Sequence, residues 1–271
     1  MNNNPDPLLD RAQALFRDNR LEEAIAVFRE VCRQSPENAQ AWHMAGAIAG
    51  MLGDDTLAKE CCRRVIELRP DLSGPWLNLG NILASEGCHA EALDSYLHAL
   101  RIAPDDPQVL TNLANLYTGA GEVDKAIECL DSAIHSDPSC IEALNNLGAI
   151  YRSLGELDKA ESCLRQALES DPGYIDALCN LGAVLNDRLD YDAAAACYRT
   201  ALKINPQSRH ALRNTGNLHQ TTGDFETAEQ YYLQALALDG NDPATITSHA
   251  SLHERCGRHA AALEIITPLI D

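Results

Sequence analysis

The chain has 271 residues, of which 45% are hydrophobic and 23% are charged. This composition is sufficient for a buried core and excludes a disordered chain. The formal charge is −19 at pH 7, an acidic excess that argues against nucleic acid as a partner and against docking on anionic lipid. No apolar run approaches the roughly 20 residues that cross a bilayer, so we expect no membrane insertion.

The first seven residues, Met1 to Pro7, contain no basic segment followed by an apolar one, which excludes a secretory signal in this stretch. The ten cysteines therefore indicate a reducing compartment rather than a disulfide framework. These two observations together predict a cytoplasmic protein.

A period of 34 residues organises the chain. Prolines recur at this interval from Pro36 to Pro206, and alanines recur from Ala24 to Ala262 without a gap. A series of glycines shares the interval and is interrupted once, by Leu189. Repetition at a fixed period of this size indicates a solenoid of stacked helical units.

Residues 141–174 indicate that one period is a pair of helices. An apolar stripe with helical spacing ends at Gly155, which is suited to a left-handed helix terminus. A second stripe ends before Pro172, because proline cannot continue the hydrogen-bond ladder of a helix. Gly148 and Ala160 have almost no side chain, so we expect the two helices to cross closely there.

A recognisable signature repeats within this period. In the third repeat it consists of Trp76, Leu79, Gly80, Ala92, Tyr96, Ala99 and Pro104. The pattern resembles the tetratricopeptide repeat, with its signature W-x2-L-G-x2-Y, then A-x3-F-x2-A, then P. The resemblance implies an all-α, right-handed superhelical solenoid of about seven full repeats plus a partial eighth. The repeats are expected to begin near residues 5, 39, 73, 107, 141, 175, 209 and 243.

The two ends of the chain depart from the pattern. Residues 1–38 are predicted to form an N-terminal capping repeat, because Arg11 and Ala12 replace the expected Leu-Gly pair. Six repeats follow over residues 39–242, and residues 243–271 form a partial C-terminal repeat in which Pro268 is expected to kink the last helix. The apolar tail offers no polar cap, which indicates a fragment of a longer protein or an end that a partner covers.

The resemblance implies that the first helix of each repeat lines a concave groove, and asparagines recur along it. An asparagine amide offers an acceptor and two donors, so it can hold both the C=O and the N–H of an extended peptide. The series is similar to the superhelical arm of the O-linked N-acetylglucosamine transferases, where asparagines hold substrate and adaptor peptides. The alternative is that these amides satisfy local backbone groups or solvent. We predict a peptide-binding groove formed by Asn78, Asn81, Asn112, Asn115, Asn146, Asn180, Asn214 and Asn217.

Chaperone-binding members of the family hold a C-terminal carboxylate with lysine and arginine at set groove positions. The matching positions here carry uncharged or acidic residues, such as Leu77, Thr111 and Glu142. Without cations the carboxylate has no counter-charge, so the sequence argues against this binding mode.

Cysteine and histidine suggest two further sites, and we predict neither. Equivalent helices of neighbouring repeats pack about 8–10 Å apart, too far for a disulfide. We therefore interpret the four cysteines that share the period as half-buried apolar residues. His249 and His253 have an i, i+4 spacing that zinc can use, but both occupy core or near-core positions, and we predict packing and solvent contacts. The four cysteines are Cys61, Cys129, Cys163 and Cys197.

No catalytic motif occurs in the sequence, and carboxylate pairs such as Asp54-Asp55 and Asp105-Asp106 stand where helices begin and cap their free N–H groups. We predict no cofactor, no metal and no enzymatic activity. The predicted function is a scaffold or adaptor that binds an extended segment of a protein or peptide partner. One alternative is the substrate-recruiting arm of a longer glycosyltransferase or sulfotransferase. Another is a scaffold that self-associates through its terminal repeats.

Overall fold

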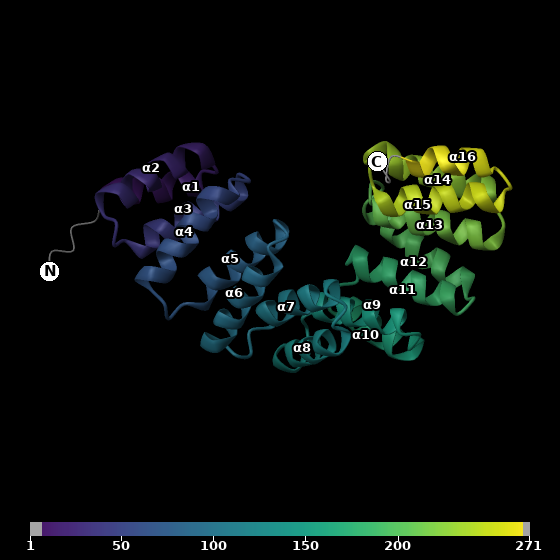
Figure 1. Cartoon of the computed structure of the whole chain (residues 1–271), viewed down its shortest axis with the longest axis horizontal. Helices are drawn as coiled ribbons and strands as arrows, with labels where there is room; N and C mark the ends of the chain where they lie inside the picture. The colour runs from purple at the N-terminus through teal and green to yellow at the C-terminus, as the bar shows by residue number, and fades with distance from the viewer. Residues whose placement is uncertain (1–6, 268–271) are drawn as a thin grey trace. The chain divides into compact units, whose positions relative to one another are not determined.

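The computed structural model describes residues 7–267, and this part of the chain consists of helices, turns and short connections without a strand. The prediction of an all-α helical repeat fold is thereby confirmed. Consecutive helices form pairs that lie side by side, and each pair is one repeat (Figure 1). Every helix in the described range falls short of the length and apolar character that a membrane span requires.

The chain forms two compact units, Met1–Ser136 and Asp137–Asp271. The first unit contains α1 (Pro7–Arg17), α2 (Leu21–Gln34), α3 (Ala39–Met51), α4 (Asp55–Leu68), α5 (Ser73–Ser85), α6 (His89–Ile102), α7 (Pro107–Gly119) and α8 (Val123–Ser136). The second unit contains α9 (Ile141–Ser153), α10 (Leu157–Ser170), α11 (Ile175–Asp187), α12 (Tyr191–Ile204), α13 (Arg209–Thr222), α14 (Phe225–Leu238), α15 (Pro243–Arg255) and α16 (His259–Ile266).

The helix starts confirm the predicted repeat phase. From the second repeat onward, the first helices begin at residues 39, 73, 107, 141, 175, 209 and 243, as the 34-residue period requires. The division into a capping repeat, six central repeats and a partial repeat stays a prediction. Pro268, the expected kink in the last helix, lies outside the described residues.

The turn inside each repeat needs one residue with a left-handed backbone. Gly155 adopts a φ of 77° after α9, as predicted. Leu189, which interrupts the glycine series, adopts a φ of 65° at the same point of its repeat and is 69% exposed. The geometry of the repeat therefore persists where the glycine is missing, although a left-handed backbone is unfavourable for a residue with a Cβ atom.

Aspartates begin several helices, as the sequence predicts. The side chain of Asp54 accepts a hydrogen bond from the Leu57 backbone N–H at 3.0 Å. Asp106 caps α7 in the same way, accepting from the N–H groups of Gln108 and Val109. Each cap satisfies N–H groups that have no partner inside the helix, and so it fixes where the helix begins.

The core of each repeat lies between its two helices. The alanines of the 34-residue series are all buried, from Ala24 to Ala262. A Cβ atom placed on Gly148 would lie 2.6 Å from Cγ of Leu164 and 3.3 Å from the carbonyl oxygen of Ala160. The expected close crossing of the two helices is confirmed, because the space that glycine leaves is already filled.

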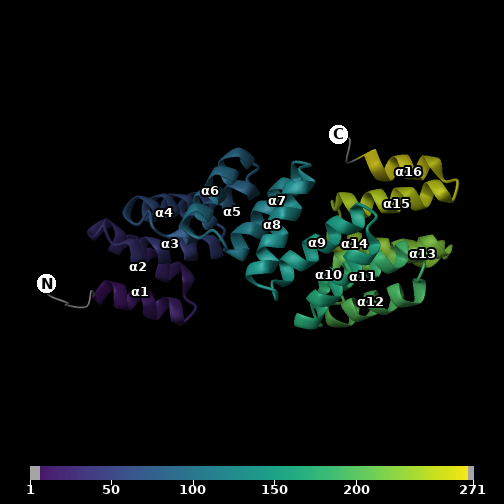
Figure 2. The same cartoon turned by 90° about the horizontal axis from the view of Figure 1, so that it is seen from below.

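The first helices of neighbouring repeats also pack on one another. In the second unit α9 contacts α11, α11 contacts α13, and α13 contacts α15, and α5 contacts α7 in the first unit. Figure 2 shows α15 and α16 of the last repeat lying alongside each other. The first helices thus form a continuous face in the second unit, and α5 and α7 form one in the first unit. The side chains on these faces are the candidates for binding.

All ten cysteines are free thiols, and the four that share the repeat period are buried or half-buried. Burial raises the pKa of the Cys61 thiol to about 12 and also raises the pKa of Cys129 and Cys197. The interpretation of these cysteines as apolar packing residues is confirmed.

Candidate functional site

The asparagines of the first unit lie on α5 and α7 and border two pockets. Asn78 and Asn81 line a pocket of about 310 Å³ together with residues of α3 and α4. Asn81 also lines a second pocket of about 600 Å³, with Asn112 and Asn115 of α7. The structure therefore brings these four predicted residues to the walls of open pockets.

The larger pocket combines amides with apolar groups. Its walls include Leu93 of α6 and Leu116 and Tyr117 of α7, beside the asparagines. Such a lining can accept an apolar side chain while the amides bond to the polar backbone that carries it. Glu122 and His89 stand among the polar lining residues.

Asn81 is the centre of a hydrogen-bond network in this face. Its Oδ1 accepts from the Tyr96 hydroxyl at 2.9 Å and from Nδ2 of Asn112 at 2.8 Å. These two bonds use both lone pairs of that oxygen. These two bonds leave the other polar groups of the pair for a ligand. The remaining donors are the N–H groups of Asn81 and one N–H of Asn112, and the remaining acceptor is Oδ1 of Asn112.

The asparagines of the second unit are more deeply placed. Nδ2 of Asn180 donates to Oδ1 of Asn145 at 2.8 Å, and Oδ1 of Asn146 accepts from Nδ2 of Asn145 at 3.2 Å. Asn214 is buried, and its Nδ2 lies 3.5 Å from the carbonyl oxygen of Cys179. In this unit the amides connect one repeat to the next.

Asn217 repeats the arrangement seen at Asn81. Its Oδ1 accepts from the hydroxyl of Tyr232 at 2.7 Å, and that hydroxyl also lies 2.6 Å from Oε1 of Gln220. Each of the two asparagines bonds to a tyrosine 15 residues further along the chain.

Sequence reasoning missed Asn145 and the tyrosine partners. It also missed that asparagines of neighbouring repeats bond to each other. The shared spacing of 15 residues between asparagine and tyrosine was the available signal. All eight predicted asparagines lie on first helices, but their role in binding a peptide stays a prediction.

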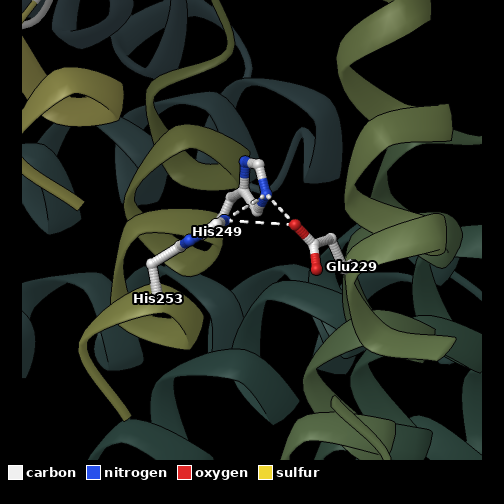
Figure 3. A group of neighbouring side chains, drawn as sticks. All are labelled: Glu229, His249 and His253. Atoms are coloured by element: carbon white, nitrogen blue, oxygen red, sulfur yellow. Dashed lines mark hydrogen bonds and ion pairs between the residues drawn. The ribbon is translucent and has the colours of Figure 1, made fainter. Parts of the chain in front are cut away.

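A second cluster lies where α14 meets α15. Nε2 of His253 lies 3.1 Å from Nε2 of His249, because residues four apart share one face of a helix. Oε1 of Glu229, on α14, lies 3.3 Å from Nε2 of His253 and 3.9 Å from Nε2 of His249 (Figure 3). Both histidines are buried, as their core positions in the repeat predict, and the glutamate is a neighbour that the sequence did not indicate.

The surroundings of His249 favour its uncharged form. Burial lowers the pKa of His249, and the neighbouring His253 lowers it further, while Glu229 acts in the opposite direction. Arg258 contacts the other carboxylate oxygen of Glu229 at 3.3 Å. The guanidinium thus holds the carboxylate with its Oε1 directed at the two imidazoles.

The fold and this first-helix face define the class, which is an α-helical repeat protein. A family model described as the "Cilia and flagella-associated protein 70 C-terminal domain" matches residues 74–267, more than half of the chain. Two models of the tetratricopeptide repeat match residues 5–48 and 39–72. The chain belongs to the family of tetratricopeptide repeat domains that these models describe. It is a protein-interaction scaffold in the general sense in which this family binds protein partners.

Solved structures agree with this fold. A tetratricopeptide repeat protein from Parabacteroides merdae has 20% identity and a TM-score of 0.71, with 85% of this chain and 91% of that chain covered. A chain of the APC/C hetero-tetramer Cut9-Hcn1 has 19% identity and a TM-score of 0.71 over 97% of this chain and 52% of its own length. Human IFIT1, solved as a dimer with m7Gppp-AAAA, has 18% identity and a TM-score of 0.65, covering 97% and 71%. No curated protein matches the sequence.

Proposed function

We propose that this scaffold holds an extended segment of a partner protein against the face formed by its first helices, with asparagine amides bonding to the backbone of the segment. The observation that carries the proposal is the larger of the two asparagine-lined pockets of the first unit. It places Asn81, Asn112 and Asn115 beside apolar walls. Amides alone would bind any backbone, whereas the apolar walls add a preference for segments with an apolar side chain at one position.

The hydrogen-bond network suggests how the backbone would be recognised. Because the Oδ1 atom of Asn81 already accepts two bonds, this residue would donate its N–H groups to a carbonyl of the segment. The Oδ1 of Asn112 would accept from an N–H of the segment. A donor and an acceptor on adjacent helices match the two polar groups of an extended residue.

The proposal is tested with a peptide selected from a random library displayed against the whole chain. The affinity of that peptide is then measured for a variant carrying Asn81→Ala and Asn112→Ala. Two lost hydrogen bonds of about 0.5–1.5 kcal/mol each lower the affinity by about fivefold to a hundredfold. Asn241→Ala is the matched control, since this exposed asparagine lies in the turn before α15 and lines neither pocket.

Two outcomes would refute the proposal. One is a selection that returns no peptide binding the chain. The other is that the double variant, the Asn241→Ala control and the original protein all bind the peptide with the same affinity. Far-UV circular dichroism must show that both variants are folded. A peptide that binds elsewhere on the scaffold would give this second result.

The two alternatives drawn from the sequence make different predictions. Self-association through the terminal repeats predicts a mass in light scattering that rises with concentration. A role as the recruiting arm of a transferase predicts that the endogenous protein is larger than 29.5 kDa by a catalytic domain. Neither result would alter the peptide test above, which concerns the first-helix face alone.

A further inference from the structure

We infer that Glu229, His249 and His253 form a binding site for one transition-metal ion of the zinc type, which joins the last two repeats. The ligand atoms are two imidazole nitrogens from α15 and one carboxylate oxygen from α14. Because α14 belongs to the seventh repeat and α15 to the eighth, an ion here would connect neighbouring repeats. This site is independent of the first-helix pockets of the other unit.

The three atoms converge on one point. They all lie within 4.8 Å of one another, with separations of 3.1, 3.3 and 3.9 Å (Figure 3). An ion with tetrahedral bonds of about 2.0–2.1 Å to each ligand requires ligand atoms about 3.3 Å apart. Two of the three separations lie close to this value, and the third needs only a small rotation of the His249 ring or the Glu229 side chain.

The two rings turn their Nε2 atoms toward each other and toward the Glu229 carboxylate, on the side where an ion would bind. A neutral imidazole carries one hydrogen, and the Nδ1 atoms of both rings are buried with no partner in the described part of the chain. If both Nε2 atoms carried the hydrogens, two N–H groups would oppose each other at 3.1 Å. If only one carried a hydrogen, it would donate to the Nε2 of the other ring across this separation, and the hydrogen of that other ring would stand on its buried Nδ1 without a partner. An ion between the Nε2 atoms and the carboxylate uses all three lone pairs at once.

The donor set indicates the kind of metal. Two histidines and a glutamate form a known zinc ligand set that leaves a fourth position open. Imidazole nitrogen also suits copper and nickel, whereas calcium and magnesium prefer all-oxygen ligands. The Glu229 side chain is 31% exposed, so an ion can reach the site from solvent although both histidine side chains are only 8% exposed.

The surroundings of the ligands set the strength and the role. Arg258 orients the Glu229 carboxylate, but the unpartnered Nδ1 atoms lack the outer hydrogen bonds that strengthen histidine ligands, a loss of about 10–100-fold in affinity. We therefore expect a micromolar site. Metalloproteases with two histidines at this spacing carry a catalytic glutamate directly after the first histidine. This chain has Ala250 at that position, so we infer that the ion stabilises the packing of the two repeats.

The test uses the full chain after treatment with a chelator, titrated with zinc sulfate in a calorimeter. We expect one ion per chain with a micromolar dissociation constant, and a thermal unfolding midpoint that rises with zinc concentration. Replacement of zinc by cobalt should give the visible absorption of a tetrahedral site. Glu229→Gln keeps the size of the side chain and should weaken binding at least tenfold. Glu226→Gln, on the exposed surface of the same helix, is the matched control and should leave binding unchanged.

A second variant protects the test against misfolding. His253→Gln removes one nitrogen ligand and should also weaken binding at least tenfold, with far-UV circular dichroism confirming the helices. Absence of zinc binding tighter than millimolar in the original chain would overturn the inference. Binding that persists unchanged in both ligand variants would do the same, because it would then belong to other histidines.

Discussion

Gly182→Ala tests whether close helix crossing holds each repeat together. Gly182 lies in α11 and faces the ring of Tyr198 in α12, and both residues are buried. A Cβ atom on this glycine would lie 2.4, 2.8 and 2.9 Å from three carbons of that ring. These separations are well inside van der Waals contact, so the ring or a helix must move.

The magnitude follows from two opposing terms. Overpacking a core by a methyl group typically costs about 1–3 kcal/mol, and the short separations favour the upper part of that range. Alanine in place of glycine inside a helix contributes a gain of about 1 kcal/mol. The net expectation is a loss of about 1–2 kcal/mol in the free energy of opening of this repeat. Gly50→Ala in α3, where a Cβ atom would meet nothing within 4 Å, should gain up to about 1 kcal/mol.

Native-state hydrogen exchange is the suitable assay, because repeats can open separately and a single unfolding free energy is then not defined. Peptides covering α11 and α12 should exchange faster in Gly182→Ala, and peptides covering α3 and α4 should not exchange faster in Gly50→Ala. The chain also supplies a rescue, since Ala114 and Leu130 occupy the equivalent positions of the fourth repeat. Adding Tyr198→Leu to Gly182→Ala should therefore recover part of the loss. Equal protection of α11 and α12 in the original chain and in Gly182→Ala would refute the reasoning.

Three further predictions concern the backbone, pH and thiols. Leu189→Gly should stabilise its repeat by up to about 1 kcal/mol in exchange measurements, since it relieves a left-handed backbone at an exposed side chain; lower stability would contradict this. Burial and Arg213 lower the pKa of His210 in the folded chain. The neutral ring therefore stabilises the fold above its unfolded pKa of about 6.5, and this stability is lost as the pH falls through the pKa of the folded state. The midpoint of urea unfolding should depend less on pH between pH 5 and 7 in His210→Gln than in the original chain, and an equal dependence would count against this cause. Cys61 should react with a thiol reagent far more slowly than half-exposed Cys88, and comparable rates by mass spectrometry would be inconsistent with burial.

The fold could be predicted from the sequence because its signals are local and repeated. Proline follows the first six helix pairs, glycine turns the chain in most repeats, and alanine marks the closest crossing. A 34-residue period therefore places the helix starts without any long-range information. Even the exception at Leu189 kept the period, since neighbouring repeats impose the turn.

The contacts between asparagines could not be predicted in the same way. Asn112 bonds to Asn81, 31 residues earlier, and Asn180 bonds to Asn145, 35 residues earlier. Neither separation equals the period, because the side chains that meet between adjacent first helices do not stand at equivalent positions of their repeats. A series read at constant spacing therefore identifies the face but not the partners within it.

The cluster on α14 and α15 illustrates a second limit. The spacing of His249 and His253 was visible in the sequence, whereas Glu229 was one acidic residue among many on the second helices. Which of these carboxylates turns toward the histidines depends on how α14 packs on α15 and on the contact with Arg258. Periodicity carries no information about that packing.

The most direct measurement of the central claim is the nuclear magnetic resonance spectrum of the asparagine side-chain amides. The spectrum is recorded before and after addition of the library-selected peptide to the nitrogen-15-labelled chain. If the first-helix face holds the peptide backbone, the NH2 resonances of Asn81 and Asn112 shift on binding while those of Asn241 stay in place. A peptide that binds while the resonances of Asn81 and Asn112 remain unchanged would contradict the account.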